Sequence, residues 1–302
     1  MKKLVVITGP TAVGKTSLCL NIARLYNIPV INADSRQIYK EMKIGTAAPT
    51  EEEQRAAFHY FVNTLELDAY YNASMYEQDV LNLLSNELFK KSDIALMSGG
   101  SMMYIDAVCN GIDDIPTVDE EVRTLLKQRL ESEGLLRLNE ELKLLDPEYY
   151  AIVDLHNTRR VIHALEICYS TGNTYTSYRV SERKKRDFEV IKIGLTRPRE
   201  DIYSRINRRV DKMIECGLIE EAQKLYANRH LNSLNTVGYK ELFDFIDGKT
   251  SLSDSIEKIK SNTRRYSRKQ LTWFKKDEQV KWFNPDCQTE ILNFLSEKIN
   301  KK

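Results

Sequence analysis

The sequence contains few of the residues that build disulfide frameworks or metal centres. Its 302 residues include only five cysteines and four histidines. The cysteines form no CxxC pair and their number is odd, so we expect reduced, buried thiols, with neither a disulfide nor a zinc site. The histidines have no ligand spacing, which argues against a His/Cys metal centre. These residues are Cys19, Cys109, Cys168, Cys216, Cys287, His59, His156, His163 and His230.

Long apolar runs are also missing. No stretch approaches the ~20 apolar residues that a helix needs to cross a bilayer. With 42% hydrophobic and 29% charged residues, the composition is that of a folded domain rather than a disordered chain. The first residues lead directly into a strand-like segment, so we expect no cleavable signal sequence. We expect a cytoplasmic protein with no membrane partner, and its length allows two domains or one domain with an insertion.

An excess of charge of one sign is missing as well, because the net charge is only +1. The charged residues nevertheless form separate runs, acidic at 51–53 and 113–121 and basic at 159–160, 183–186, 205–209 and 264–269. A nucleic-acid-binding face on a near-neutral protein produces this kind of separation. For any single run, a solvated helix face is the competing interpretation.

A complete phosphate-binding loop (P-loop) follows the apolar segment 4–7. Its residues are Gly9, Pro10, Thr11, Ala12, Val13, Gly14, Lys15 and Thr16. A strand, a glycine-bridged turn and a helix (17–26) direct backbone N–H groups and the positive helix end at one point. Lys15 adds a mobile cation, and Thr16 adds a hydroxyl for Mg²⁺. The loop predicts a bound diphosphate, and it leaves open whether the phosphates are transferred or expelled.

Short apolar segments closed by polar or glycine residues recur at 29–32, 94–97 and 188–195. This pattern is typical of a parallel sheet buried on both faces, so we expect an α/β core. Helical periodicity replaces it at 116–187 and returns from Pro198 to Trp273. The sequence therefore predicts a P-loop NTPase-like core made of 1–115 and 188–302, with an inserted all-helical domain at 116–187 and a helical C-terminal part.

Polar side chains follow two of these predicted strands. Asp34 comes after the second strand, and Ser98-Gly99-Gly100-Ser101 comes after the third. The carboxyl ends of parallel strands line one crevice, so we expect Asp34 to face the same pocket as Lys15, as a base or a metal ligand. The glycines allow close approach of a ligand. A helix cap or turn is the competing role for Asp34.

These motifs together resemble the bacterial tRNA dimethylallyltransferase family (IPP transferases) over nearly the whole chain. Beyond the P-loop, the matching segments are Asp34 to Tyr39, Ile44 to Pro49, Gly99-Gly100-Ser101, Arg205 with Arg209, Met213 and Gly217, Val237-Gly238-Tyr239, and Arg268 to Phe274. The departures are few. Ser101 stands where the family usually has threonine, Ala48 where lysine is commoner, and His163 where arginine is frequent.

The resemblance implies transfer of a dimethylallyl group from dimethylallyl diphosphate to N6 of the adenosine 3′ of the anticodon in tRNA, with release of diphosphate. It implies that Asp34 is the general base and that the Ser101 hydroxyl orients the amine. It also implies that the P-loop, Mg²⁺ near Thr16 and Arg209 stabilise the leaving diphosphate. The expected partners are this donor and the anticodon stem-loop of tRNA, bound by a monomer.

A set of residues is expected to contact tRNA. On a helix that begins near Asn157, Arg159 and His163 share a face opposite an apolar stripe of Val161, Leu165 and Cys168. The other members match tRNA-contacting segments of the family. The whole set is Asp34, Ser35, Arg36, Gln37, Ser101, Arg123, Arg159, Arg160, His163, Gly238, Tyr239, Lys240, Arg264, Arg268 and Lys269.

Three other functions share part of this pattern. An isopentenyltransferase for free adenine nucleotides needs neither the helical insertion nor the basic C-terminal helix. A small-molecule kinase does not account for the Asp34 and Ser101 motifs together, and a non-catalytic RNA-binding module does not account for the catalytic set. For Tyr239 and Trp273, core packing competes with RNA contact, and we favour core packing for Trp273 because its surroundings are apolar.

Overall fold

The computed structural model describes residues 1–179 and 184–301. Two compact units are present, one formed by Met1–Cys109 with Arg186–Lys302 and the other by Asn110–Lys185. The strands of the first unit are β1 (Lys3–Thr8), β2 (Val30–Asn32), β3 (His59–Tyr60), β4 (Ile94–Ser98), β5 (Glu189–Leu195) and β6 (Lys281–Phe283).

The first unit also contains most of the helices. They are α1 (Lys15–Tyr26), α2 (Glu51–Ala56), α3 (Ala73–Leu83), the π-helix η1 (Leu84–Leu88), α4 (Phe89–Lys91), α5 (Met102–Asn110), α10 (Arg199–Glu215), α11 (Leu218–Leu225), the 3₁₀ turns η2 (Tyr226–Asn228) and η3 (Asn232–Leu234), α12 (Tyr239–Ile246), α13 (Leu252–Phe274) and α14 (Gln288–Asn300).

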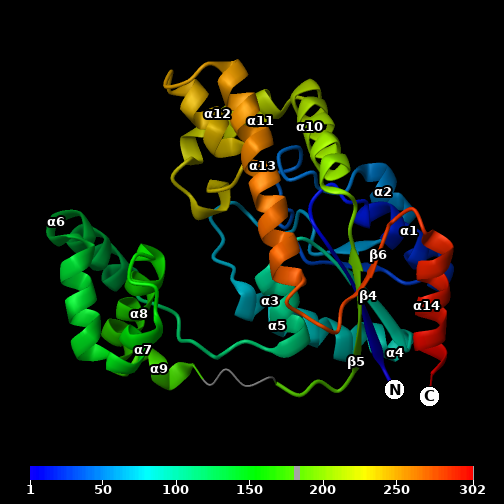
Figure 1. Cartoon of the computed structure of the whole chain (residues 1–302), viewed down its shortest axis with the longest axis horizontal. Helices are drawn as coiled ribbons and strands as arrows, with labels where there is room; N and C mark the ends of the chain where they lie inside the picture. The colour runs from blue at the N-terminus through cyan, green and yellow to red at the C-terminus, as the bar shows by residue number, and fades with distance from the viewer. Residues whose placement is uncertain (180–183, 302) are drawn as a thin grey trace. The chain divides into compact units, whose positions relative to one another are not determined.

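The sheet of the first unit has six strands in the order β3-β2-β4-β1-β5-β6, and every neighbouring pair is parallel. Helices cover both of its faces (Figure 1). In the central strand β1, Leu4 and Val6 belong to the core that contains α3 and α5, whereas Val5 and Ile7 belong to the core that contains α1 and α14. Because both faces of β1 are buried, the strand is a continuous apolar run, as the sequence predicts for a parallel α/β sheet.

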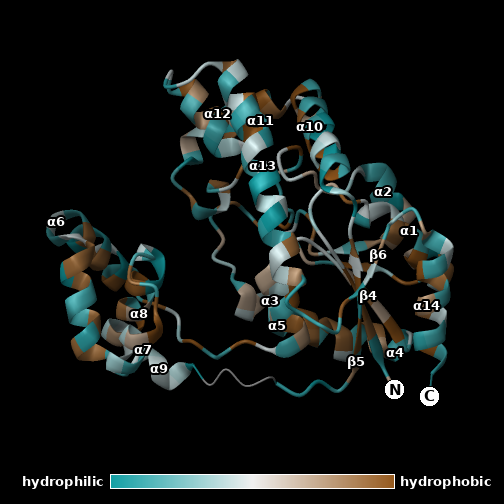
Figure 2. Cartoon of the chain, viewed as in Figure 1, coloured by the Kyte–Doolittle hydropathy of each residue, from teal (hydrophilic) through white to brown (hydrophobic). Residues whose placement is uncertain are grey.

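The sequence did not predict every element of the first unit. Among those missed are the edge strands β3 and β6 and the last helix, α14. The two edge strands have only two and three residues, too short for a strand pattern to be visible in the sequence. They exist because they pair with β2 and β5. In Figure 2, α14 carries both teal and brown residues, the pattern of an amphipathic helix.

Helices α10, α11, α12 and α13 form a further core within the first unit. The helical periodicity predicted from Pro198 onward is confirmed on α10, where Ile202, Ile206 and Val210 are buried. Val210 packs with buried residues of the other three helices and with Met42 from the segment after β2. This packing attaches the helices to the loops at the carboxyl edge of the sheet.

All the regular elements described in the second unit are helices, namely α6 (Glu120–Leu145), α7 (Pro147–Ile152), α8 (Thr158–Thr171) and α9 (Tyr175–Tyr178). Its own core includes Leu126, Leu138, Val161 and Leu165. Non-helical backbone at Gly134 (φ 79°, ψ 166°) kinks α6. Arg183, in the predicted basic run 183–186, lies outside the described residues. No helix of the described chain is both long and apolar enough to span a bilayer.

The cysteines differ in part from the prediction of buried thiols. All five are free, and Cys19, Cys109 and Cys168 are buried. Cys216 and Cys287 are exposed, so the prediction is wrong for these two. Both lie at helix boundaries, Cys216 at the C-cap of α10 and Cys287 at the N-cap of α14. Apolar neighbours in the sequence do not bury a residue that occupies a helix end.

Candidate active site

The P-loop joins the end of β1 to the start of α1, as the sequence predicts. Gly9 has φ +142°, and a Cβ built there would lie 2.6 Å from the carbonyl oxygen of Leu195, so a larger residue does not fit. Gly14 is the N-cap of α1. The Lys15 Nζ turns back and donates hydrogen bonds to the carbonyl oxygens of Gly9 and Pro10, each at 2.9 Å. The loop therefore folds around the Lys15 ammonium group at the positive end of α1.

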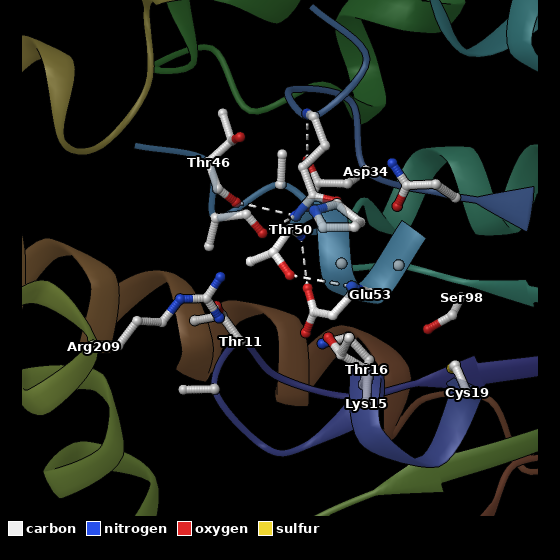
Figure 3. Close-up of a pocket in the computed structure, with 18 of the residues that line it drawn as sticks. Thr11, Lys15, Thr16, Cys19, Asp34, Thr46, Thr50, Glu53, Ser98 and Arg209 are labelled. Atoms are coloured by element: carbon white, nitrogen blue, oxygen red, sulfur yellow. Dashed lines mark hydrogen bonds between the residues drawn. The ribbon is translucent and has the colours of Figure 1, made fainter. Parts of the chain in front are cut away.

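A cavity of about 950 Å³ opens beside this loop (Figure 3). The structure places nine of the predicted site residues in its lining, namely Thr11, Ala12, Val13, Gly14, Lys15, Thr16, Asp34, Gln37 and Arg209. The loop after β4 contributes Gly99 and Gly100, and α13 contributes Tyr266 and Gln270. The cavity thus lies at the carboxyl ends of β1, β2 and β4, where ligands bind in open α/β sheets.

Lys15 and Arg209, two of the cations that line this cavity, have no carboxylate bound directly to them among the described residues. Burial and the neighbouring charge of Arg209 lower the pKa of Lys15 from 10.5 to about 8. Burial likewise lowers the pKa of Arg209, while the charges of Asp34 and Glu53 act in the opposite direction. The nearest polar contact of Arg209 is from Nη1 to the Thr11 hydroxyl, at 3.5 Å. Desolvated cations of this kind suit an anionic ligand.

Asp34 begins a tight turn after β2. Its Oδ1 accepts hydrogen bonds from the backbone N–H groups of Arg36 at 2.9 Å and Gln37 at 3.4 Å. Asp34 therefore has the turn-forming role that was the alternative to a catalytic role in the interpretation of the sequence. It uses only one carboxylate oxygen, and Oδ2 has no hydrogen-bond donor in the described part of the chain. Asp34 is therefore held by one oxygen, and its other oxygen is available as a base.

Ser101 supports this turn from the neighbouring strand. Its hydroxyl accepts a hydrogen bond from the Ser35 N–H at 2.8 Å and donates one to the Ser35 hydroxyl at 3.0 Å. Ser101 is buried, and it is not among the residues that line the cavity. Gln37, by contrast, lines the cavity and donates to the carbonyl oxygens of Thr46 and Ala47. The structure thus places Ser101 behind the Asp34 turn.

Helix α10 and the segment just before it hold the P-loop through contacts that the sequence did not predict. Arg205 Nε donates to the Ala12 carbonyl oxygen at 2.7 Å, and Arg197 Nε donates to the Val13 carbonyl oxygen at 3.0 Å. Arg205 is part of the arginine motif of the resemblance, which is the only sequence signal for its position. Arg197 precedes α10 and has no such signal.

Tyr239 occupies the core rather than an RNA-contacting surface. It is 0% exposed, and its hydroxyl donates to Glu221 at 2.6 Å. The Glu221 carboxylate also accepts from the backbone N–H groups of residues 43, 44 and 45, at 3.1, 2.8 and 2.9 Å. The prediction that Tyr239 contacts tRNA is therefore wrong for its side chain, because that side chain is enclosed by protein. Gly238 is buried as well, and Lys240 is exposed.

Trp273 shows the opposite error. We favoured core packing for it, but it is 37% exposed, and its Nε1 donates to Asp106 at 2.8 Å. The apolar neighbours that suggested burial include Phe274, which is buried. Trp273 lies on the solvent side of the last turn of α13, so the prediction is wrong.

The remaining predicted RNA contacts are surface or partly exposed residues. Arg268 and Lys269 are exposed on α13, and Arg264 donates to Asn207 at 2.6 Å. In the second unit, Arg159 and Arg160 are exposed on α8. Two other predicted RNA contacts in the second unit have acidic partners. Arg123 pairs with Glu120 at 3.0 Å, and His163 contacts Glu166 at 3.4 Å.

Comparison with known proteins gives concordant results. A family model described as IPP transferase matches residues 37–277. The chain is 58% identical over 298 residues to tRNA dimethylallyltransferase 1 of Bacteroides fragilis, a match that covers 99% of each chain. The full-length tRNA isopentenylpyrophosphate transferase of Bacillus halodurans superimposes with a TM-score of 0.71 at 37% identity, covering 99% of this chain and 97% of that one. A eukaryotic dimethylallyltransferase acting on tRNA, at 24% identity, shares the fold with a TM-score of 0.78 over 98% of this chain and 80% of that one.

Proposed function

The chain belongs to the IPP transferase family, and from this premise we propose which of its residues carry the reaction of a tRNA dimethylallyltransferase. The enzyme transfers a dimethylallyl group from dimethylallyl diphosphate to N6 of the adenosine 3′ of the anticodon, and diphosphate is released. The observation that supports the assignment is the position of the Lys15 and Arg209 cations and the Asp34 carboxylate in one cavity.

The P-loop binds the diphosphate of the donor as a leaving group. As the allylic C–O bond breaks, negative charge develops on the diphosphate, and preorganised donors at that point lower the barrier. The donors are the loop N–H groups, the Lys15 ammonium and the Arg209 guanidinium. Both side chains are already desolvated, so little reorganisation is needed when the charge develops. The loop thus serves departure of the diphosphate rather than transfer of a phosphoryl group.

Asp34 takes the proton from the amine as the new bond forms. The N6 amino group of adenine is a weak nucleophile because its lone pair is delocalised into the ring, so a positioned base is required. Oδ1 is held by the turn, which leaves Oδ2 for the proton. The adenine leaves its stack in the anticodon loop to reach this carboxylate, at a cost of a few kcal/mol. A single-stranded loop is where this cost is smallest.

The chemistry of the cavity fits Mg²⁺ as a cofactor. The described residues contain no cluster of three or more histidine, cysteine or carboxylate side chains that could hold a metal ion. Mg²⁺ does not require one, because it commonly binds one or two protein oxygens, several waters and the phosphates of a substrate. The Thr16 hydroxyl, at the start of α1 and in the cavity lining, would hold it. When bound, the ion would neutralise part of the diphosphate charge.

The anticodon stem-loop binds to basic surfaces. We assign these to Lys240, Arg264, Arg268 and Lys269 in the first unit and to Arg36 beside Asp34, where the uncharged Ser35 is also expected to contact tRNA. The inserted helical domain, predicted at 116–187, contributes Arg123, Arg159, Arg160 and His163. Phosphate contacts made by such residues supply affinity without reading sequence. The cytoplasmic location and the monomeric state stay predictions.

One incubation tests this function against its alternatives. Purified protein is mixed with unmodified tRNA, AMP, dimethylallyl diphosphate, ATP and Mg²⁺, and nucleosides and nucleotides are analysed by mass spectrometry. We expect N6-dimethylallyladenosine in the tRNA and unchanged AMP and ATP. Prenylated AMP would indicate the nucleotide-specific transferase, and ADP a kinase. An Arg209→Ala variant should bind tRNA normally but prenylate it about 100-fold more slowly.

A further inference from the structure

Gln270 joins the two sides of the active-site cavity. It lies on α13 and is 1% exposed. Its Oε1 accepts a hydrogen bond from the backbone N–H of Thr11 at 2.9 Å, and its Nε2 donates one to the carbonyl oxygen of Gly100 at 2.8 Å. One buried side-chain amide therefore bonds two loops that are far apart in the sequence.

The two partners of this amide belong to different parts of the proposed site, one to the part that binds the diphosphate and the other to the part that holds Asp34. Thr11 is part of the P-loop, which holds the leaving diphosphate. Gly100 directly precedes Ser101, whose hydroxyl bonds to Ser35 next to Asp34. The chain of contacts from Thr11 through Gln270 to the Gly100–Ser101 turn thus connects the donor side with the base.

The local packing is specific for an amide at this position. A Cβ built on Gly100 would lie 2.6 Å from Gln270 Nε2, so a larger residue at 100 would displace the amide. Tyr266, one turn earlier on α13, donates to the same Gly100 carbonyl oxygen at 3.3 Å. An uncharged side chain that donates at one end and accepts at the other is required, because a backbone N–H and a backbone carbonyl face it.

We propose that Gln270 is a positioning residue that sets the location of the P-loop relative to the Asp34 turn, and so the distance between the donor's allylic carbon and the amine that attacks it. This inference rests on the proposed function. Rates of transfer between two bound substrates fall steeply when the reacting atoms are misplaced by about 1 Å, whereas the binding of each substrate depends on its own half of the site. Loss of the amide should therefore affect turnover more than binding.

The first test is Gln270→Met, which keeps the length and volume of the side chain and removes both hydrogen bonds. We expect kcat to fall about 100-fold, with the KM for dimethylallyl diphosphate and the Kd for tRNA within about 3-fold of wild type. The matched control is Ser267→Ala, on the same helix and also buried (3% exposed, against 1% for Gln270) but outside the cavity lining. It should retain wild-type kcat. Thermal unfolding of each variant checks that it is folded.

The second test is Gln270→Glu, measured as a function of pH. An ionised carboxylate accepts from Thr11 but cannot donate to Gly100, whereas a protonated carboxyl group does both, as the amide does. Burial favours the protonated form. The ratio of variant to wild-type kcat should therefore rise as the pH is lowered from about 8 to about 6. A side chain that merely fills space would give a constant ratio.

The outcomes separate this inference from the proposed function. If the wild-type enzyme does not prenylate tRNA, the proposed function fails. If it does, but Gln270→Met keeps kcat within about 3-fold of wild type, or loses activity only through KM, the positioning role is overturned. A pH-independent ratio for Gln270→Glu would overturn it as well, even where Gln270→Met is poorly folded.

Discussion

The Ser101 hydroxyl bonds to Ser35 twice, accepting from its backbone N–H at 2.8 Å and donating to its side-chain hydroxyl at 3.0 Å. The loop after β4 thereby fixes the residue that follows Asp34. In this arrangement Ser101 would act on Asp34, the proposed base, through the turn, and the role implied by the family resemblance, orientation of the amine, stays a prediction.

Ser101→Ala removes both of these hydrogen bonds. We expect the single-turnover rate of prenylation to fall about 10-fold, because a buried N–H is left without its partner and the turn loosens. Ser101→Thr keeps the hydroxyl and should remain within about 2-fold of wild type. Rapid-quench assays with saturating tRNA and donor would measure both rates. Equal rates for the alanine and threonine variants would show that the hydroxyl has no part in catalysis.

Asp34→Asn should separate the structural role of this residue from its chemical role. The amide oxygen of asparagine accepts the same N–H groups of Arg36 and Gln37, so the turn is kept while the base is lost. We expect turnover to fall about 100-fold or more, with donor and tRNA affinities nearly unchanged. Asp34→Ala, the comparison variant, should also lose stability. Prenylation by the asparagine variant at the wild-type rate would falsify the assignment.

Above about pH 8, Lys15 should take up a proton when dimethylallyl diphosphate binds. Burial and the charge of Arg209 lower the pKa of Lys15 to about 8, and a bound diphosphate would raise it again, so a lysine that is neutral at pH 9 becomes protonated on binding. Donor affinity should accordingly weaken as the pH rises through 8. Calorimetry at pH 9 in buffers of different ionisation enthalpy measures the proton uptake. Lys15→Arg, which stays charged, should show none.

The lowered pKa of Lys15 also affects the free energy of unfolding. Its contribution there should rise with pH, whereas donor affinity should fall. Between about pH 8 and 10.5, the folded state without donor binds fewer protons at Lys15 than the unfolded state does. The contribution of Lys15 to the free energy of unfolding therefore rises with pH over that interval. Lys15→Met should remove this rise. Urea unfolding of both proteins at pH 8 and pH 10 would reveal a difference, and parallel pH dependences would contradict the lowered pKa.

Glu221 should be more important for stability than for chemistry. Its carboxylate accepts from three backbone N–H groups at residues 43–45 and from the Tyr239 hydroxyl. In Glu221→Gln, the side-chain NH₂ replaces one carboxylate oxygen and cannot accept the hydrogen bonds that this oxygen accepted. We expect the free energy of unfolding to fall by about 2 kcal/mol or more. Tyr239→Phe removes one bond and should cost about 1 kcal/mol. Denaturant titrations would compare them, and equal losses would contradict the anchoring role.

The second unit should contribute to tRNA affinity through phosphates. Arg159→Ala and Arg160→Ala each remove an exposed cation from α8. Each should weaken tRNA binding and reduce the slope of log Kd against log salt by about one, while kcat at saturating tRNA is unchanged. Arg137→Ala, on α6 in the same unit, is the control because Arg137 pairs with Glu140. Fluorescence anisotropy at several salt concentrations is the measurement, and unchanged slopes would exclude α8 from the RNA surface.

The elements predicted correctly have signals confined to neighbouring residues. The P-loop is one continuous segment, and its glycines, Lys15 and Thr16 act within a single turn of chain. The central strands are apolar runs because both faces of the sheet are covered. Asp34 could be assigned to the same cavity because parallel strands end at one edge. Short-range chemistry and sheet topology are sufficient for each of these inferences.

Other features depend on partners that are remote in the chain. Gln270 reaches the P-loop across 259 positions, Arg205 across 193, and Glu221 reaches Ile44 across 177. Tyr239 and Trp273 are both large aromatic residues on helices, yet packing of α11 against α12 encloses the first, and the second faces solvent. Residue type and local periodicity carry no information about which distant backbone a side chain will meet. Only the folded chain, by bringing α10 and α13 against the P-loop, decided how the P-loop and the Asp34 turn are held together.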